Sequence, residues 1–220
     1  MRKVCLLGTS STLKDAPLSD TSFEFWALNN MYVSITLEGV TKWFQIHSES
    51  SVRASDQWEH FKKFPPTVQI YMQKQHDEIP QSVAYPLDEI QAKYRGLFQS
   101  TLDYMIALAL YEGDINEIHI YGVDMATNTE YAYQRPSMYY WLGRAEQAGI
   151  KVVLPDNCDL LKCYYKYGYE DEKKSDIATK LRARHAELDR NGNAQMKDYY
   201  LSLGAKDTCA FYLREMGEDL

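Results

Sequence analysis

Short apolar runs that end at a small or polar residue recur along the first two thirds of the chain. They cover residues 3–8, 23–28, 42–46, 68–72, 117–121 and 151–154. Runs of this length, bounded by turn residues, are typical of buried β-strands. The pattern therefore predicts six strands.

Helical spacing appears between several of these runs. The clearest set recurs at intervals of three and four residues: Leu97, Thr101, Tyr104, Met105, Leu108 and Ala109. Gly113 follows this set as a stop signal. Further helices are expected over residues 52–64 and from about Pro136, placed in the first turn, to Gly149. Residues 73–93 are expected to loop across a face of the protein.

Strands that alternate with helical segments indicate an α/β protein with a doubly wound, mostly parallel, Rossmann-like sheet. We expect residues 1–165 to form this domain. The chain then becomes charged and helical, with Gly192 as a break, which predicts a C-terminal α-helical hairpin over residues 166–220. The apolar face of the hairpin needs a cover, either the α/β domain or a second copy of the chain in a homodimer.

Composition narrows the class of protein. The chain has 220 residues, of which 45% are hydrophobic and 25% charged, as in an ordinary globular protein. Its net charge of −7 disfavours binding duplex nucleic acid over a large surface, whereas a local pocket for one nucleotide stays open. No apolar run reaches the roughly 18 residues that cross a membrane. The four cysteines form no CxxC pair, which indicates a reduced, cytoplasmic protein without a structural zinc site or a disulfide framework.

Polar residues gather where the predicted parallel strands end, which is the edge at which open α/β sheets bind ligands. The first two strands are followed by Gly8, Thr9, Ser10, Ser11, Thr12, Asn29 and Asn30. Backbone N–H groups and hydroxyls after a strand suit a phosphate group, although an ordinary polar turn has the same composition. An asparagine amide can pair with the edge of a base or with ribose hydroxyls, or it can form an Asx turn.

Further positions carry candidate chemistry. His47 follows the third strand, and because histidine titrates near neutral pH it is a candidate general base, or else a hydrogen-bonded structural histidine. Asp124, close to Gly122, suits the orientation of a sugar or a metal ion, or the capping of its own loop. The stretch from Tyr131 through Arg135 to Tyr140 is rich in aromatic rings, which suits a lid over a site or a helix that packs on its neighbours.

The order of these motifs resembles a known family. The segments that carry the resemblance span about residues 3–155 and read GTSSTL, ALNNMY, QSTLDYMIALAL, EIHIYGVDM and KVVLP. They are similar to bacterial sialyltransferases of the Campylobacter type and to domain-of-unknown-function proteins with a hydroxymethylpterin-diphosphokinase-like fold. Short proteins of tailed phages, mostly without assigned function, have a similar pattern.

The resemblance implies contacts to a nucleotide from residues 8–13, Asn29, Ser100, Thr101, Gly122, Asp124 and Tyr131. The first group would hold the phosphate or ribose, Gly122 and Asp124 would border the sugar, and Tyr131 would lie near the phosphate. This chain departs from the family at two places. Ser10-Ser11 stand where the family has Gly-Pro, and Met138 stands where the family has its general-base histidine. That role would therefore fall to His47, from a different strand end.

Three hypotheses follow. The first is a nucleotide-dependent, glycosyltransferase-like transferase with a nucleotide-sugar donor. In it His47 or Asp124 would deprotonate the acceptor, and Tyr131 or Arg135 would stabilise the departing phosphate. The second is a non-catalytic protein that binds or sequesters a small nucleotide. The third is a pyrophosphoryl transferase that requires Mg²⁺ on carboxylates such as Asp124.

Overall fold

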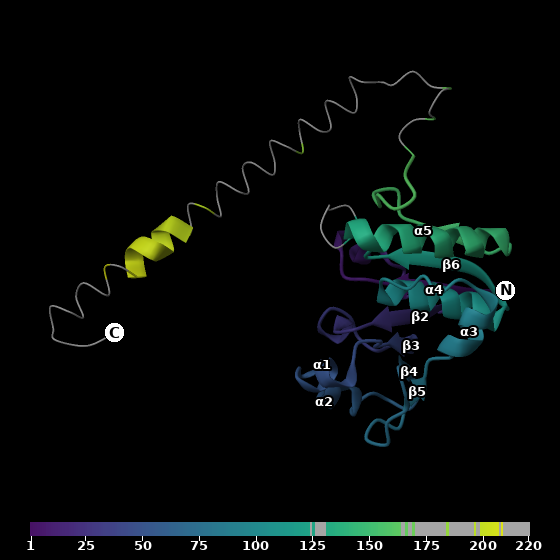
Figure 1. Cartoon of the computed structure of the whole chain (residues 1–220), viewed down its shortest axis with the longest axis horizontal. Helices are drawn as coiled ribbons and strands as arrows, with labels where there is room; N and C mark the ends of the chain where they lie inside the picture. The colour runs from purple at the N-terminus through teal and green to yellow at the C-terminus, as the bar shows by residue number, and fades with distance from the viewer. Residues whose placement is uncertain are drawn as a thin grey trace. The chain divides into compact units, whose positions relative to one another are not determined.

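One parallel sheet organises the part of the chain that the computed structural model describes, which is residues 1–123, 125, 131–163, 166, 169, 184, 196, 199–206 and 208. Its strands there are β1 (Arg2–Leu7), β2 (Phe23–Leu28), β3 (Val40–Phe44), β4 (Gln69–Met72), β5 (Ser82–Ala84), β6 (Ile115–Tyr121) and β7 (Lys151–Val153). They lie in the order β5-β4-β3-β2-β1-β6-β7, and all neighbours are parallel (Figure 1). The predicted Rossmann-like α/β fold is thereby confirmed.

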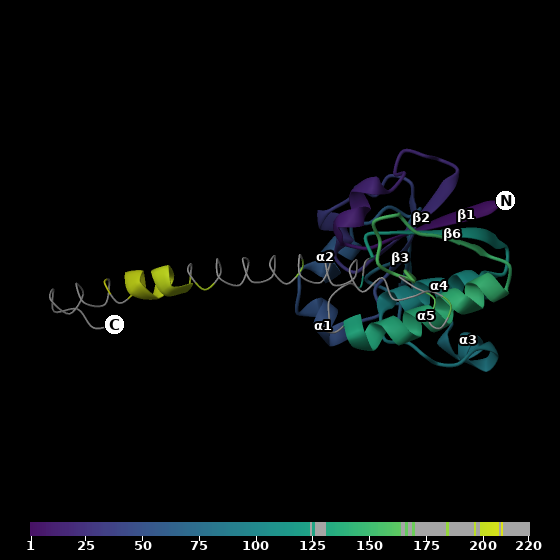
Figure 2. The same cartoon turned by 90° about the horizontal axis from the view of Figure 1, so that it is seen from above.

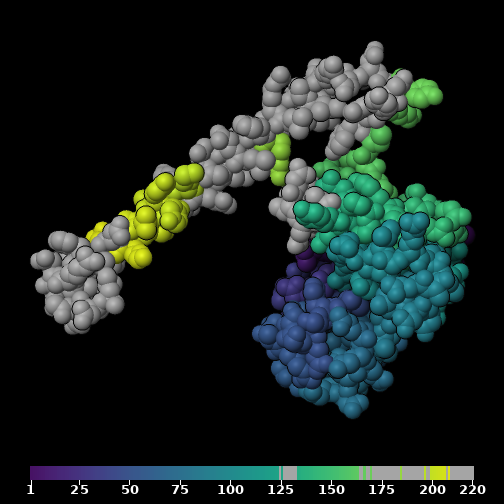
Figure 3. All heavy atoms as spheres, in the orientation of Figure 1, coloured from purple at the N-terminus to yellow at the C-terminus, as the bar shows by residue number. Residues whose placement is uncertain are grey.

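Helices connect the strands and cover the sheet. They are the 3₁₀ helices η1 (Ser11–Asp15) and η2 (Met31–Val33), and α1 (Glu49–Arg53), α2 (Gln57–Phe61), α3 (Leu87–Lys93), α4 (Thr101–Glu112) and α5 (Tyr131–Gln147). Helices α3, α4 and α5 lie together on one side of the sheet (Figure 2). In the space-filling view, the purple and blue segments from β2 to β5 lie directly against the teal and green ones from α3 to α5 (Figure 3).

The strand order reverses at β1. The chain runs outward from β1 to β5 on one side, then returns to place β6 and β7 on the other side. Between β1 and β6 the connections therefore leave the sheet in opposite directions. In open α/β sheets this reversal point, at the carboxyl ends of the strands, is where ligands bind.

Helix α4 lies against the centre of the sheet and is buried on nearly all sides. It contacts β2, β3 and β6 as well as α5, and eight of its twelve residues are buried. The buried residues of α4 thus cover more of the helix surface than the single apolar stripe that the spacing predicts. Leu97, which belongs to that predicted stripe, precedes the helix and is 41% exposed. Gly113 ends α4 in the left-handed conformation, with φ of 77°, as expected of a helix stop.

Three predicted elements are corrected. Residues 73–93 are not a loop, because they contain the edge strand β5 and helix α3. The single helix expected over 52–64 is two helices, because the Ser55 hydroxyl donates to Val52 O at the end of α1 and accepts from Gln57 N at the start of α2. Helix α5 begins at Tyr131 rather than near Pro136, so the proline lies inside the helix, at a cost of one backbone hydrogen bond.

The amino edge of the sheet is closed by paired charges. Arg2 holds both carboxylate oxygens of Glu24, at 2.6 and 2.9 Å, and reaches Glu112 of α4 at 2.6 Å. Lys42 is 9% exposed, lies 3.2 Å from Glu112 and stands over the ring of Trp26. The hydrogen bond from Arg2 is the main reason that the pKa of Glu24 lies below its usual range. These charges therefore pair with one another at the amino ends of the strands.

A buried carboxyl group fixes the start of α4. Asp103 Oδ2 accepts hydrogen bonds from Gln99 N, Ser100 N and Ser137 Oγ, each at 2.8 Å. The bond from Ser137 ties α4 to α5. Burial raises the pKa of Asp103 above its ordinary value, although these hydrogen bonds oppose the shift. The carboxyl therefore organises the helix start while its ionised form carries a desolvation cost.

The predicted division at residue 165 stays a prediction. The chain separates into two compact units, Met1–Lys162 and Cys163–Leu220. In the second unit residues 199–206 are helical, and the rest of the predicted hairpin and of its dimer contact lies largely outside the described residues. None of the helices in the described ranges combines the length and the apolar character that a bilayer crossing requires.

Replacing Asp103 tests its anchoring role. Asp103→Ala should lower the free energy of unfolding by about 1–3 kcal/mol, because buried donors lose their acceptor. Asp103→Asn should be better tolerated, because it keeps an accepting oxygen. Since the pKa of Asp103 is raised, the wild type loses stability as pH rises above the ordinary value of 3.8, and the Asn variant lacks this loss. Urea unfolding at several pH values measures both effects. Equal damage from Ala and Asn at every pH would contradict the role.

Candidate functional site

The predicted strand-end residues of β1 and β6 meet in the structure. Gly8 N donates to Tyr121 O at 2.8 Å, Ser10 N donates to Gly122 O at 2.8 Å, and Gly122 N donates to Thr12 Oγ1 at 2.9 Å. The two backbones are so close that a Cβ on Gly8 would overlap Gly122 O, and a Cβ on Gly122 would overlap Gly8 O. The loop after β1 is therefore fixed to the loop after β6 at the reversal point of the sheet.

The residues of the loop after β1 differ in what they offer a ligand. Thr12 is buried and takes part in the tie to Gly122, so its hydroxyl is an internal contact. Ser10 is half-buried, with its Oγ 3.4 Å from Thr12 Oγ1. Thr9 and Ser11 are exposed. The predicted phosphate-binding loop thus presents an outer rim of hydroxyls on a rigid base.

Asn29 and Thr101 lie together, as their expected roles require. Asn29 follows β2 in the left-handed conformation, with φ of 48°, which asparagine tolerates better than most residues. Its main chain is held by a bond from its N–H to Phe44 O and by Trp43 Nε1, which donates to Asn29 O, each at 2.9 Å. Thr101 Oγ1 donates to Asn29 Oδ1 at 3.4 Å. Within the described part of the chain, the Asn29 Nδ2 group makes no hydrogen bond, so it is available to a ligand.

Asn30 and Ser100 have structural positions. Asn30 is exposed and precedes η2 without a capping bond from its side chain. Ser100 precedes α4, and its N–H is held by Asp103. Its Oγ is buried at the start of the helix. Asn30 is therefore the more accessible of these two predicted contacts.

His47 stands beyond the end of β3 with a partner that the sequence analysis missed. The residue is exposed, and its Nδ1 lies 2.6 Å from Gln45 Oε1. Gln45 is fully buried, and its Nε2 is 2.5 Å from Gln57 Oε1 at the start of α2. The signal in the sequence is a glutamine inside the apolar run at 42–46, two positions before the histidine.

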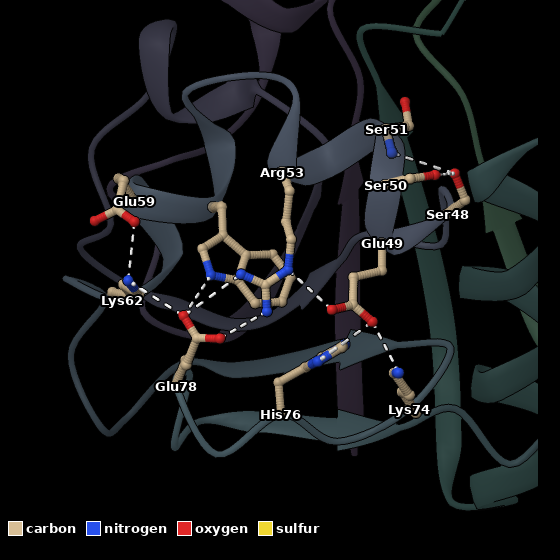
Figure 4. A network of polar contacts seen from close by, with 11 residues as sticks. Ser48, Glu49, Ser50, Ser51, Arg53, Glu59, Lys62, Lys74, His76 and Glu78 are labelled. Carbon is tan, nitrogen blue, oxygen red and sulfur yellow. Dashed lines mark hydrogen bonds and ion pairs between the residues drawn. The ribbon is translucent and has the colours of Figure 1, made fainter.

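A network of charges holds the segment that follows His47 (Figure 4). Glu49 of α1 pairs with Arg53 at 2.9 Å and with Lys74, beyond β4, at 2.8 Å. Arg53 in turn pairs with Glu78 at 2.6 Å and lies 3.6 Å above the ring of Trp58. Hydrogen bonds from Lys74 and Arg53 lower the pKa of Glu49 to about 2, and bonds from Arg53 and Trp58 do the same for Glu78. The network thereby links α1 and α2 to the segment between β4 and β5.

The side of the site beyond β6 is described in part. Asp124 and the side chain of Tyr131 lie outside the described residues. The Arg135 guanidinium donates to Met125 O, which places this cation beside the loop after β6. Met138, which the motif resemblance sets against a general-base histidine, is fully buried. Within the same described ranges, no group of three or more His, Cys, Asp or Glu side chains is arranged to hold a metal ion.

Some aromatic side chains of α5 pack against neighbouring residues. Tyr140 packs against Trp141, and its hydroxyl accepts from Arg95 N at 3.0 Å. Tyr133 is 80% exposed. The packing interpretation therefore holds for Tyr140, and a lid stays a hypothesis that the exposed Tyr133 leaves open.

A search of solved structures finds a likeness to the sialyltransferase CstII from Campylobacter jejuni in complex with a substrate analogue, cytidine-5′-monophosphate. The sequence identity is 16% and the TM-score is 0.47, over 70% of this chain and 79% of that chain. No model of a known protein family matches the chain, and no curated protein matches it. The α/β assignment therefore rests on the sheet itself, and the chemistry of the site rests on its own residues.

Substitution of Gly122 tests the contact at the reversal point. Gly122 and Gly149 both have left-handed φ values, 74° and 84°, but nothing lies within 4 Å of a Cβ added at Gly149. Gly149→Ala should therefore cost only the conformational term, about 1–2 kcal/mol. Gly122→Ala should lose more than about 3 kcal/mol, or fail to fold, because the Gly8 backbone must also move. Chemical denaturation measures the free energy of unfolding of both variants. Similar decreases in Gly122→Ala and Gly149→Ala would contradict the close contact.

The charge network predicts an acid-sensitive contribution to stability. The pKa values of Glu49 and Glu78 fall from 4.5 to about 2 on folding, so their contribution is complete above about 4.5 and is lost as pH falls towards 2. Glu78→Gln should be less stable at neutral pH and should lose less on acidification. Thermal unfolding between these pH values measures how steeply stability falls with pH. Glu38→Gln, at an exposed position, serves as the control, and an unchanged slope in Glu78→Gln would contradict the network's role.

Proposed function

We propose that this chain is a nucleotide-dependent transferase of the glycosyltransferase kind, which takes a nucleotide-sugar donor at the carboxyl edge of its sheet. The observation that carries the proposal is that four kinds of group share the carboxyl edge of the sheet, beyond β1, β2, β3 and β6: exposed hydroxyls, an exposed imidazole, a cation, and an amide whose Nδ2 has no partner among the described residues. Each group matches one part of such a donor or of its reaction. The motif resemblance described above agrees with this assignment.

The donor site is built from groups that suit a nucleotide. Thr9 and Ser11 offer hydroxyls on the rim of the loop at the reversal point, where phosphates bind in this class of sheet. Asn29 Nδ2, which has no other partner in the described chain, offers a donor to a base edge or to ribose. Thr101 Oγ1 lies 3.4 Å from Asn29 Oδ1, and the main chain of Asn29 is held by hydrogen bonds with Phe44 O and Trp43 Nε1. The main chain that carries the amide is thus preorganised.

In the proposed reaction His47 removes the proton from an acceptor hydroxyl. The acceptor oxygen then forms a bond to the anomeric carbon of the sugar as the bond from that carbon to the phosphate oxygen breaks. The electron pair of the broken bond leaves with the nucleotide, whose new charge Arg135 stabilises. The proton on His47 passes to solvent. A positioned base of this kind contributes roughly 10²–10⁴-fold to the rate.

The test is turnover of a panel of nucleotide sugars by purified protein. His47→Ala should reduce kcat by roughly 10²–10⁴-fold while the nucleotide still raises the midpoint of thermal unfolding, because the base does not hold the donor. A ligand at 100 times its Kd adds about 2.7 kcal/mol to the stability of the folded state.

His60→Ala is the matched control, because this histidine stacks on Tyr32, with ring centroids 4.3 Å apart, and has no role in the scheme. Full turnover in His47→Ala would remove the residue from the mechanism. Binding of a nucleotide without turnover of any donor would replace the transferase with the non-catalytic alternative.

A further inference from the structure

Gln45 is buried beneath His47 and contacts it twice. Its Oε1 lies 3.2 Å from the backbone N of His47 and 2.6 Å from Nδ1 of the ring. We infer that Gln45 is a positioning residue that fixes His47 in the tautomer needed for a general base. The expected effect on catalysis rests on the proposed function, whereas the effect on the tautomer does not.

The hydrogen bonds determine which way the Gln45 amide points. A backbone N–H is always a donor, so the side-chain atom facing the His47 N–H must be the oxygen. The amide nitrogen then faces Gln57 Oε1 at 2.5 Å, which is a donor–acceptor pair of the correct sense. Because Gln45 is 0% exposed, water does not compete for either end. The orientation therefore follows from the fold rather than from a free choice between two rotamers.

The amide orientation in turn determines the histidine tautomer. The ring nitrogen beside an amide oxygen must carry a proton, so a neutral His47 is protonated at Nδ1. The lone pair then lies on Nε2, which is the nitrogen able to accept a proton from an acceptor hydroxyl. A base oriented by a third group is the arrangement found in nucleophile–base systems. Here the third group is a neutral amide, which orients the ring without adding a negative charge.

Two neighbouring contacts keep the arrangement rigid. Gln57 belongs to α2, which the charge network around Arg53 and Trp58 holds in place. Gln73, on the exposed surface after β4, donates from Nε2 to Ile46 O at 2.8 Å, at the residue before His47. Gln73 therefore supports the same backbone without touching the imidazole, which makes it the matched control for Gln45.

The direct test is ¹⁵N NMR of the imidazole nitrogens at alkaline pH, with the His47 signals assigned by their loss in His47→Ala. In the wild type Nδ1 should show the shift of a protonated nitrogen, and Nε2 that of an unprotonated one. Gln45→Met should move the ring towards the Nε2–H tautomer, because the acceptor at Nδ1 is gone. Gln45→Glu should keep the Nδ1–H tautomer, and Gln73→Met should leave it unchanged.

The outcomes separate this inference from the proposed function. A wild-type ring with the proton on Nε2, or a tautomer that Gln45→Met leaves unchanged in a folded protein, would overturn the positioning role whatever the turnover. If Gln45→Met does not fold, the tautomer of His47 in the wild type and in Gln45→Glu still tests the positioning role. In an active enzyme Gln45→Met should lower kcat by about 10- to 100-fold with the donor KM unchanged, less than removal of the base itself. The expected tautomers with full turnover in His47→Ala would support the positioning and reject the catalytic proposal.

Discussion

The backbone contact between Gly8 and Gly122 is the constraint on which the candidate site depends. These residues directly follow β1 and β6, and the space between them admits no side chain on either. Their hydrogen bonds, together with the one from Gly122 to Thr12, join two loops that leave the sheet in opposite directions. Because β2 and β3 pair in parallel beside β1, with about 4.8 Å between neighbouring strands, Asn29 and His47 follow strands that lie one and two positions from this pair. The close contact between these two stretches of main chain thus anchors the candidate site.

The two edges of the sheet use charge differently. At the amino edge Arg2 and Lys42 are matched by Glu24 and Glu112, so ionic groups there stabilise the fold and are already satisfied. At the carboxyl edge the candidate site offers mainly amides, hydroxyls and an imidazole, together with the Arg135 guanidinium beside the loop after β6. Neutral groups of this kind recognise polar ligands without the desolvation cost that an unpaired charge carries. Further ion pairs lie around Arg53, where they link helices α1 and α2 to the segment between β4 and β5.

Much of the fold could be predicted because buried parallel strands read as continuous apolar runs, and β2 matches its predicted run residue for residue. Elements with little buried surface could not be predicted in this way. Strand β5 has three residues, and in α3 only Ile90 is buried. The strand-end candidates followed from topology, since the carboxyl ends of parallel strands share an edge. For Gln45 the sequence shows only a glutamine inside an apolar run, and the contacts that give Gln45 and Asp103 their roles, with Gln57 and Ser137, arise from tertiary packing.

The central claim is that ligands bind where the β1 and β6 ends meet, and backbone amide NMR tests it most directly. A uniformly ¹⁵N-labelled protein would be titrated with nucleoside mono- and diphosphates and with nucleotide sugars. The account predicts saturable shifts at the amides of Gly8, Asn29, His47 and Gly122, with none at Arg2 or Gln69 on the amino edge. Shifts confined to the amino edge, or no shift with any of these ligands, would contradict it.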